Sequence, residues 1–126
     1  MAKKILIVDD EPDLVEGLTM MLKSKGYKVV PAYDGEEAIK KVEEENPDLI
    51  ILDIMMPKMD GYTFAKELKA NIHMKCIPVI VVTAKEKMQE PFAIEGIKDY
   101  VVKPFEYLDL LGKIEKLLKE KEGDKR

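Results

Sequence analysis

The stretch KKILIVDD, residues 3–10, joins an unbroken apolar run to two adjacent carboxylates. A short continuous aliphatic run such as residues 5–8 is typical of a strand that is buried on both faces of a parallel sheet. Asp9 and Asp10 follow at once. Two carboxylates about 4 Å apart repel each other by on the order of 4 kcal/mol at an effective dielectric constant of about 20, so we expect a positive group or a cation beside them.

Runs of the same kind recur along the chain, and amphipathic stretches separate them. The runs predict strands at residues 5–8, 27–30, 48–53, 78–82 and 99–102. The apolar positions that predict helices are Leu14, Leu18, Met21 and Leu22; Ala38, Ile39 and Val42; Phe64, Ala65 and Leu68; and Leu108, Leu111, Ile114, Leu117 and Leu118. Gly26 predicts the end of the first helix. Strands and helices that alternate in this way predict one doubly wound α/β sheet of five parallel strands.

Composition limits the possible functions. With 126 residues the chain is long enough for one domain with its own core. Its net charge is −4 without a basic patch, which argues against direct nucleic-acid binding. The apolar run after the basic start is too short for a signal peptide or a membrane span, so we expect no membrane insertion and a cytoplasmic location. We expect the single cysteine, Cys76, to be a small buried hydrophobe.

Polar residues follow four of the five predicted strands at the point where each strand ends. The first strand is followed by Asp9 and Asp10, the third ends in Asp53, the fourth in Thr83 and the fifth in Lys103. The second strand ends without such a residue. Because the carboxyl ends of parallel strands share one edge of the sheet, where ligands bind in open α/β sheets, we expect these side chains to converge.

The converging side chains have a defined chemistry. Three carboxylates supply the hard oxygen ligands that Mg²⁺ prefers, and the cation would offset the repulsion between Asp9 and Asp10. One carboxylate can act as a nucleophile toward a phosphoryl group and form an aspartyl-phosphate. A metal and a lysine stabilise charge on the transferred group, and a threonine hydroxyl can donate a hydrogen bond to it.

Each of these residues taken alone has a plainer interpretation. Asp9 and Asp10 could cap a helix, Thr83 could be an ordinary strand residue, and Lys103 could lie in a surface loop. Their combination at one edge of the sheet favours a phosphoryl-transfer site over these separate structural roles.

Four stretches of the chain, ILIVDDEP, PDLIILDIMMPKMDG, PVIVVTA and DYVVKPF, resemble the receiver domain of bacterial two-component response regulators. The resemblance covers essentially the whole chain. It implies a flavodoxin-like sheet with strand order 2-1-3-4-5. It also implies a receiver domain over residues 1–121, followed by a polar C-terminal tail over residues 122–126.

By this resemblance, Asp53 is the phosphoacceptor and Mg²⁺ is the cofactor. The ion is bound by Asp9, Asp10 and Asp53 and by the backbone carbonyl of Met55. The domain then catalyses only its own phosphorylation and slow dephosphorylation, so we expect a switch and not an enzyme. Met55 also occupies a position that tunes the lifetime of the phosphoryl group in the family, and its apolar side chain predicts slow self-hydrolysis.

The resemblance also implies how the site responds to phosphorylation. Thr83 and Lys103 are expected to hold the phosphoryl group. Thr83 and Tyr100 form the switch, and Tyr100 turns inward when the site is occupied. The Lys103-Pro104 dipeptide matches one that usually has a cis peptide bond in the family.

Residues 84–97 depart from the family pattern. The interval between Thr83 and Lys103 is shorter than usual, and Pro91 can open a helix but cannot continue one. We therefore expect the fourth helix of the fold to be short or irregular. The surface that partners read after phosphorylation is then expected to be altered as well.

The leading prediction is a phosphorylation-activated switch. A sensor histidine kinase would donate the phosphoryl group, an unknown downstream protein would bind the activated form, and the domain would be a monomer or a phosphorylation-dependent dimer. An alternative is the receiver fragment of a larger DNA-binding transcriptional regulator. A Mg²⁺-dependent phosphatase is disfavoured, because such enzymes typically carry a second Asp where this chain has Met55.

Overall fold

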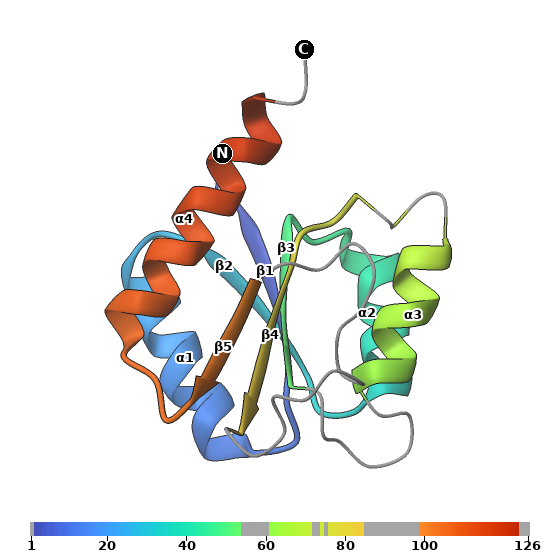
Figure 1. The fold of residues 1–126 in the computed structure, drawn as a ribbon, viewed down its shortest axis with the longest axis horizontal. Helices are drawn as coiled ribbons and strands as arrows, with labels where there is room; N and C mark the ends of the chain where they lie inside the picture. The colour runs from blue at the N-terminus through green and yellow to red at the C-terminus, as the bar shows by residue number, and fades with distance from the viewer. Residues whose placement is uncertain (1, 54–60, 72–73, 75, 85–98, 124–126) are drawn as a thin grey trace.

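The computed structural model describes residues 2–53, 61–71, 74, 76–84 and 99–123. Within these residues, five strands form one parallel sheet in the order β2-β1-β3-β4-β5 (Figure 1). The strands are β1 (Lys4–Val8), β2 (Lys28–Ala32), β3 (Leu49–Asp53), β4 (Val79–Ala84) and β5 (Asp99–Lys103). The predicted doubly wound parallel sheet and its flavodoxin-like strand order are both confirmed.

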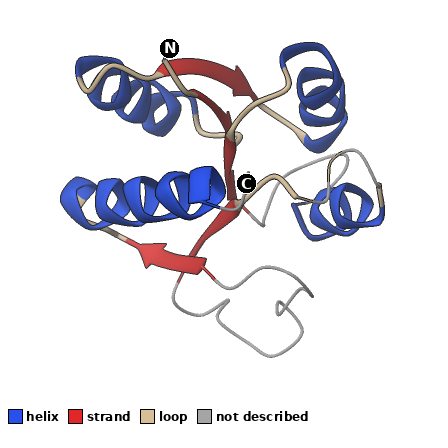
Figure 2. Cartoon of the chain, turned by 90° about the horizontal axis from the view of Figure 1, so that it is seen from above, coloured by secondary structure: helices blue, strands red, loops and turns tan. Residues whose placement is uncertain are grey.

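Helices cover both faces of the sheet. The described helices are α1 (Pro12–Ser24), α2 (Gly35–Glu45), α3 (Gly61–Ala70) and α4 (Tyr107–Gly123). Seen from above, α1 and α4 lie on one face, and α2 and α3 lie on the other (Figure 2). Across the described part of the chain, no helix combines the length and the apolar character that a membrane span requires. The segment predicted to hold a short or irregular helix, residues 84–97, lies outside the described residues except for Ala84, which ends β4.

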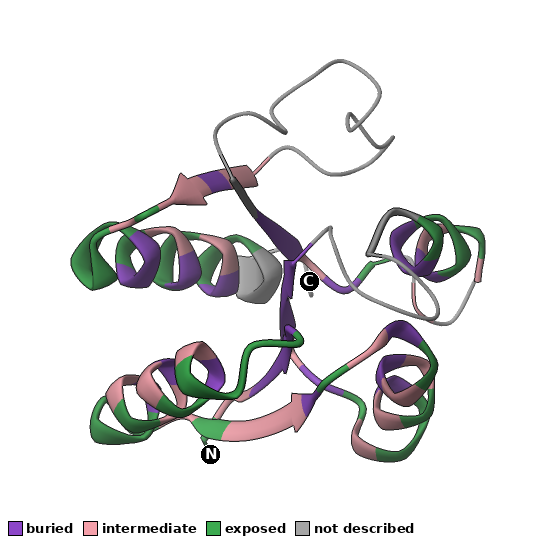
Figure 3. Ribbon diagram, turned by 90° about the horizontal axis from the view of Figure 1, so that it is seen from below, coloured by how far each residue is buried: buried purple, intermediate pink, exposed green. Residues whose placement is uncertain are grey.

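The strands are apolar on both faces because each face packs against helices. Along β1, Ile5 and Ile7 belong to the core beneath α1 and α4, whereas Leu6 and Val8 belong to the core beneath α2 and α3. All four side chains are fully buried, and the central strands of the sheet are buried along much of their length (Figure 3). The unbroken apolar run that opens the chain is therefore shared between two cores.

The end of α1 follows the predicted pattern. Gly26 has a φ of +94°, a left-handed conformation that glycine adopts without steric cost. Its backbone N–H donates to the carbonyl of Lys23 at 3.0 Å, and the N–H of Tyr27 donates to the carbonyl of Leu22 at 3.1 Å. These bonds satisfy the last carbonyls of the helix and turn the chain into β2.

Strand β2 is longer at its carboxyl end than the sequence predicted. The prediction stopped at Val30, but the strand continues through Pro31 to Ala32, and Pro31 pairs in register with Ile7. Proline has no N–H to donate, which excludes it from most central strands. Because β2 lies at the edge of the described sheet, one of its sides has no partner among the strands that the structure describes, and proline is tolerated there.

Two predictions of burial were wrong. Leu108 was assigned to the apolar stripe of the last helix, but it is 77% exposed, whereas Leu110 is fully buried. At 3.6 residues per turn, Leu108 lies about 120° around the helix from Ile114, the centre of the buried stripe. Cys76 was predicted to be buried, but it is exposed, because the turn before β4 directs the neighbouring Ile77 into the core instead.

Candidate functional site

The structure brings four of the predicted site residues together at the carboxyl edge of the sheet. Asp9 and Asp10 follow β1, and Asp53 is the last residue of β3. Carboxylate oxygens of these three residues lie within 4.8 Å of one another. The Lys103 ammonium, at the end of β5, lies 3.4 Å from Oδ2 of Asp9 and 3.4 Å from Oδ2 of Asp53.

The backbone holds Asp9 at the centre of this cluster. Its N–H donates to the carbonyl of Ala32 at 3.1 Å, which ties the residue to the end of β2. Its Oδ1 accepts a hydrogen bond from the backbone N–H of Glu11 at 2.9 Å. The second oxygen, Oδ2, is the one that contacts Lys103, so one carboxylate oxygen is fixed by the backbone and the other faces the site.

Burial makes this carboxylate unusually basic. Asp9 and Asp53 are only 3% and 6% exposed. Desolvation raises the pKa of Asp9 to about 6, the charge of Asp53 adds to this rise, and the hydrogen bond from Glu11 and the charge of Lys103 oppose it. The two buried carboxylates therefore destabilise each other, and a cation beside them would relieve the cost.

Lys103 is the cationic side chain that the described residues place inside this cluster. Partial burial lowers its pKa, but the hydrogen bond to Glu11 and the charges of Asp9 and Asp53 outweigh that effect, so the pKa of Lys103 is raised above its ordinary value. The ammonium is therefore charged throughout the physiological pH range. The peptide bond between Lys103 and Pro104 is cis, as the resemblance implied.

The donor set of the cluster fits a small divalent cation. Asp9, Asp10 and Asp53 each offer a carboxylate oxygen, two of the three residues are buried, and Asp10 is exposed toward solvent. Mg²⁺ prefers one or two carboxylates with several waters, and an exposed side of the site leaves room for those waters. Met55, whose backbone carbonyl was predicted to complete the ligand set, lies outside the described residues.

The two predicted switch residues lie on neighbouring strands. Thr83 is the penultimate residue of β4 and pairs in register with Val102 of β5. Tyr100 pairs with Val81, is half-buried, and packs against the core beneath α2 and α3. Thr83 and Tyr100 therefore lie on two adjacent strands, β4 and β5, and Lys103 is the last residue of β5.

Two contributions to the site were not predicted from the sequence. The first is Glu11, whose Oε1 lies 2.8 Å from the Lys103 ammonium. The available signal was its place as a third consecutive acid after Asp9 and Asp10. The second is the carbonyl of Ala32, which no side-chain pattern could reveal because the contribution comes from the backbone.

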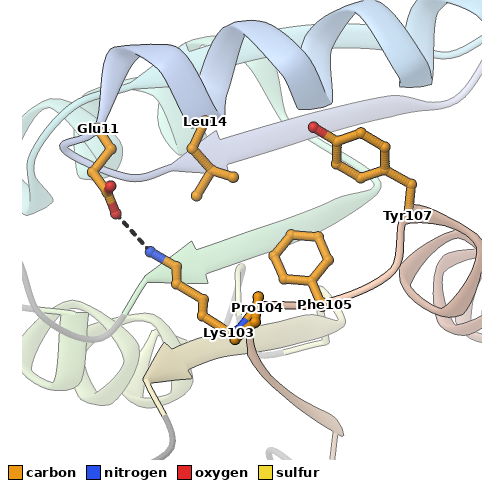
Figure 4. A pocket seen from close by; sticks show the side chains of 6 residues that line it. All are labelled: Glu11, Leu14, Lys103, Pro104, Phe105 and Tyr107. Atoms are coloured by element: carbon orange, nitrogen blue, oxygen red, sulfur yellow. Dashed lines mark hydrogen bonds and ion pairs between the residues drawn. The ribbon is translucent and has the colours of Figure 1, made fainter.

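A pocket of about 390 Å³ adjoins the cluster on the side of α1 and α4. Its lining residues are Glu11, Leu14, Lys103, Pro104, Phe105 and Tyr107 (Figure 4). The Phe105 and Tyr107 rings meet edge to face with their centroids 6.1 Å apart. The Glu11–Lys103 ion pair lies at the end of the pocket nearest the carboxylates, and the rest of the lining is mainly apolar.

The chain is similar to proteins of a known family. Residues 5–115 match the family model described as the response regulator receiver domain. The chain is 43% identical over 124 residues to the alkaline phosphatase synthesis transcriptional regulatory protein PhoP of Bacillus subtilis. That match covers 97% of this chain but 51% of PhoP, so the chain spans about half the length of this curated relative.

Solved structures give the same result. A CheY-like response regulator receiver domain from Methanospirillum hungatei is 30% identical, with a TM-score of 0.90, and the match covers 98% of this chain and 99% of that one. The response regulator TrrA from Thermotoga maritima, solved in complex with Mg²⁺ and BeF, is 38% identical, with a TM-score of 0.82. The match to TrrA covers 91% of this chain and 98% of that one.

Proposed function

The chain belongs to the family of response regulator receiver domains of two-component systems, and we propose that it is a phosphorylation-activated switch with Asp53 as the phosphoacceptor. The observation that carries this proposal is the position of Asp53, a buried carboxylate at a strand end with the Lys103 ammonium 3.4 Å away. A carboxylate anion can attack phosphorus without a general base, because it carries no proton that must be removed.

The proposed transfer is a displacement at phosphorus. A carboxylate oxygen of Asp53 forms the new bond, and the bond from phosphorus to the nitrogen of a kinase phosphohistidine breaks, so that the imidazole leaves with the electron pair. Lys103 stabilises negative charge on the transferred group. Thr83 is proposed to donate a hydrogen bond to it, and Tyr100 to turn inward when the group is present.

The cofactor we propose is Mg²⁺, held by Asp9, Asp10 and Asp53 and by the backbone carbonyl of Met55. The ion would supply positive charge to the oxygens of the phosphoryl group. Two observations support it: the three carboxylate oxygens lie close together, and the similar regulator TrrA has been solved with Mg²⁺ and BeF.

The proposed donor is a sensor histidine kinase in the cytoplasm, and the proposed output is a protein contact. The domain itself is not an enzyme with a separate substrate, since its chemistry is limited to its own phosphorylation and slow dephosphorylation. Binding energy for a downstream protein then differs between the phosphorylated and unphosphorylated conformations. A change between monomer and dimer on phosphorylation is one form that this output can take.

A second candidate function is favoured by one observation. The relative PhoP is a transcriptional regulatory protein, and this chain matches about half of it. The chain would then be the receiver part of a longer DNA-binding regulator. Reading the gene beyond the codon for Arg126 distinguishes the two candidates, because a DNA-binding domain encoded there would support the second.

The first prediction tests the phosphoacceptor. Incubation with acetyl phosphate and Mg²⁺ is expected to add one phosphoryl group to the parent chain, with release of acetate, and none to Asp53→Ala. Intact-protein mass spectrometry measures the gain, and a parallel incubation with a chelator measures its dependence on the metal. Equal gains in the parent and in Asp53→Ala would exclude Asp53 as the acceptor, and no gain in the parent at any Mg²⁺ concentration would contradict the proposed function.

A further inference from the structure

Among the described residues, Glu11 has the carboxylate nearest to the Lys103 ammonium. Its Oε1 lies 2.8 Å from the Lys103 nitrogen, whereas Asp9 and Asp53 each lie 3.4 Å from it. The dashed line in Figure 4 marks this contact, which joins the start of α1 to the end of β5. A distance of 2.8 Å is typical of a charge-assisted hydrogen bond, and 3.4 Å is a looser ion pair.

The three carboxylate partners that the described residues give Lys103 differ in burial. The Glu11 side chain is 62% exposed, but those of Asp9 and Asp53 are buried. The ammonium therefore lies between a buried pair of carboxylates and a single exposed carboxylate. Its strongest hydrogen bond is to the exposed one, which holds the ammonium on the solvent side of the cluster.

We propose that Glu11 is a positioning residue that holds Lys103 at the outer side of the site and competes for its ammonium with a phosphoryl group on Asp53. The inference rests on the proposed function, in which Lys103 contacts that group. An anionic group on Asp53 attracts the ammonium inward, and inward movement lengthens the 2.8 Å contact with Glu11. Glu11 therefore opposes occupation of the site, and its removal strengthens the binding of an anionic group at Asp53.

The side chain of Glu11 makes no capping bond that would complicate a test. Glu11 is the N-cap residue of α1, but its side chain accepts no hydrogen bond from the first turn of the helix. The bond that does support the site comes from its backbone N–H to Oδ1 of Asp9. A side-chain substitution leaves that backbone donor in place, so Glu11→Gln is expected to fold as the parent does.

Two variants separate the contact from the general effect of a negative charge. Glu11→Gln removes the charge at nearly constant size. Glu11→Asp keeps the charge but is one methylene shorter, and aspartate at an N-cap position prefers to accept from the backbone of the first turn. Its carboxylate is thereby drawn away from Lys103. Glu16→Gln is the matched control, since Glu16 is an exposed acid on the same helix outside the cluster.

The test measures binding of beryllofluoride, a stable mimic of the phosphoryl group, by fluorine NMR at a Mg²⁺ concentration that saturates every variant. We expect Glu11→Gln and Glu11→Asp to bind it about two- to fivefold more tightly than the parent, the range that corresponds to loss of one partly exposed ion pair. Glu16→Gln is expected to bind as the parent does. Thermal melting of each variant provides the check on folding.

Two results would overturn the inference. One is equal affinity in the parent and in Glu11→Gln. The other is tighter binding in Glu11→Gln together with parental binding in Glu11→Asp, because that pattern assigns the effect to charge alone. If the parent binds no beryllofluoride and gains no phosphoryl group from acetyl phosphate, the proposed function itself fails and the inference fails with it. If the parent is phosphorylated but Glu11→Gln and Glu11→Asp bind beryllofluoride as the parent does, the inference fails and the proposed function stands.

Discussion

Ionised Asp9 destabilises the folded chain, because the cost of burying its charge exceeds the stabilisation from the Lys103 ammonium 3.4 Å away. Burial raises its pKa from an ordinary value of 3.8 to about 6. The folded chain therefore takes up a proton at Asp9 at higher pH than the unfolded chain does. In metal-free protein, ionised Asp9 lowers the free energy of unfolding above about pH 6, and this cost disappears as the pH falls toward about 4.

The substitution Asp9→Asn is accordingly expected to stabilise the metal-free protein at high pH. At pH 8 the free energy of unfolding should rise by on the order of 2–3 kcal/mol, since each pKa unit corresponds to about 1.4 kcal/mol. Below about pH 4, where Asp9 is protonated in both states, the gain should vanish. Urea unfolding in the presence of a chelator at several pH values measures the difference.

The control for this prediction is Asp13→Asn, which neutralises an exposed acid in the first turn of the same helix. Loss of a negative charge near a helix N-terminus is expected to reduce stability slightly. An Asp9→Asn variant that is no more stable than the parent at pH 8 would show that burial of this carboxylate carries no net cost.

At the scale of elements, the start of α4 packs closely against α1 at Gly17. A Cβ atom on Gly17 would lie 2.6 Å from the hydroxyl oxygen of Tyr107. The absence of a side chain at position 17 therefore gives the tyrosine ring room to lie against α1 beside the pocket. Glycine within a helix costs about 1 kcal/mol relative to alanine, so this fit reduces the intrinsic stability of α1.

The substitution Gly17→Ala is expected to show this coupling. In the parent chain the gain in helix propensity is offset by displacement of the Tyr107 ring, so the net change in stability should be small. In a Tyr107→Ala background the same substitution should stabilise the chain by about 0.5–1 kcal/mol. A double-mutant cycle measured by urea unfolding gives the coupling energy, and strictly additive effects would contradict the contact.

Several elements could be predicted from the sequence because their signals are local. Unbroken aliphatic runs identified the strands, and Gly26 identified the end of α1. Pro31 misled the prediction of β2, since its acceptability depends on the strand lying at the sheet edge. The burial of Leu108 in α4 was wrongly predicted. An apolar residue in the first turn of a helix can lie three residues before a buried one, as Leu108 does before Leu111, and still point away from the core.

The site was predictable to the extent that strand ends determine it. The approach of Asp9, Asp53 and Lys103 follows from parallel strands with a common carboxyl edge. The contact between Glu11 and Lys103 depends instead on how two side chains meet across the sheet. That meeting is a tertiary property, and the sequence contains no spacing that specifies it.

At the scale of the whole molecule, a cation bound at the acidic cluster would stabilise the complete fold. The three carboxylates come together only in the folded chain, so Mg²⁺ should bind the folded state and raise the melting temperature by mass action. A concentration of 100 times the dissociation constant corresponds to about 2.7 kcal/mol. We expect the melting temperature of the parent to rise with the logarithm of Mg²⁺ concentration, and that of Asp9→Asn to respond much less. A matching rise with NaCl at equal ionic strength would contradict specific binding.

Asp9 and Lys103 are 94 positions apart in the chain and meet only because β1, β3, β4 and β5 are assembled side by side. Two kinds of incomplete chain have the aspartates but no ammonium beside them. One is a nascent chain whose β5 has not yet left the ribosome, and the other is a chain that a protease has cleaved before β5. If phosphoryl transfer needs that ammonium, such incomplete chains would not be phosphorylated. Only a chain that has been completely synthesised and folded would then take part in signalling.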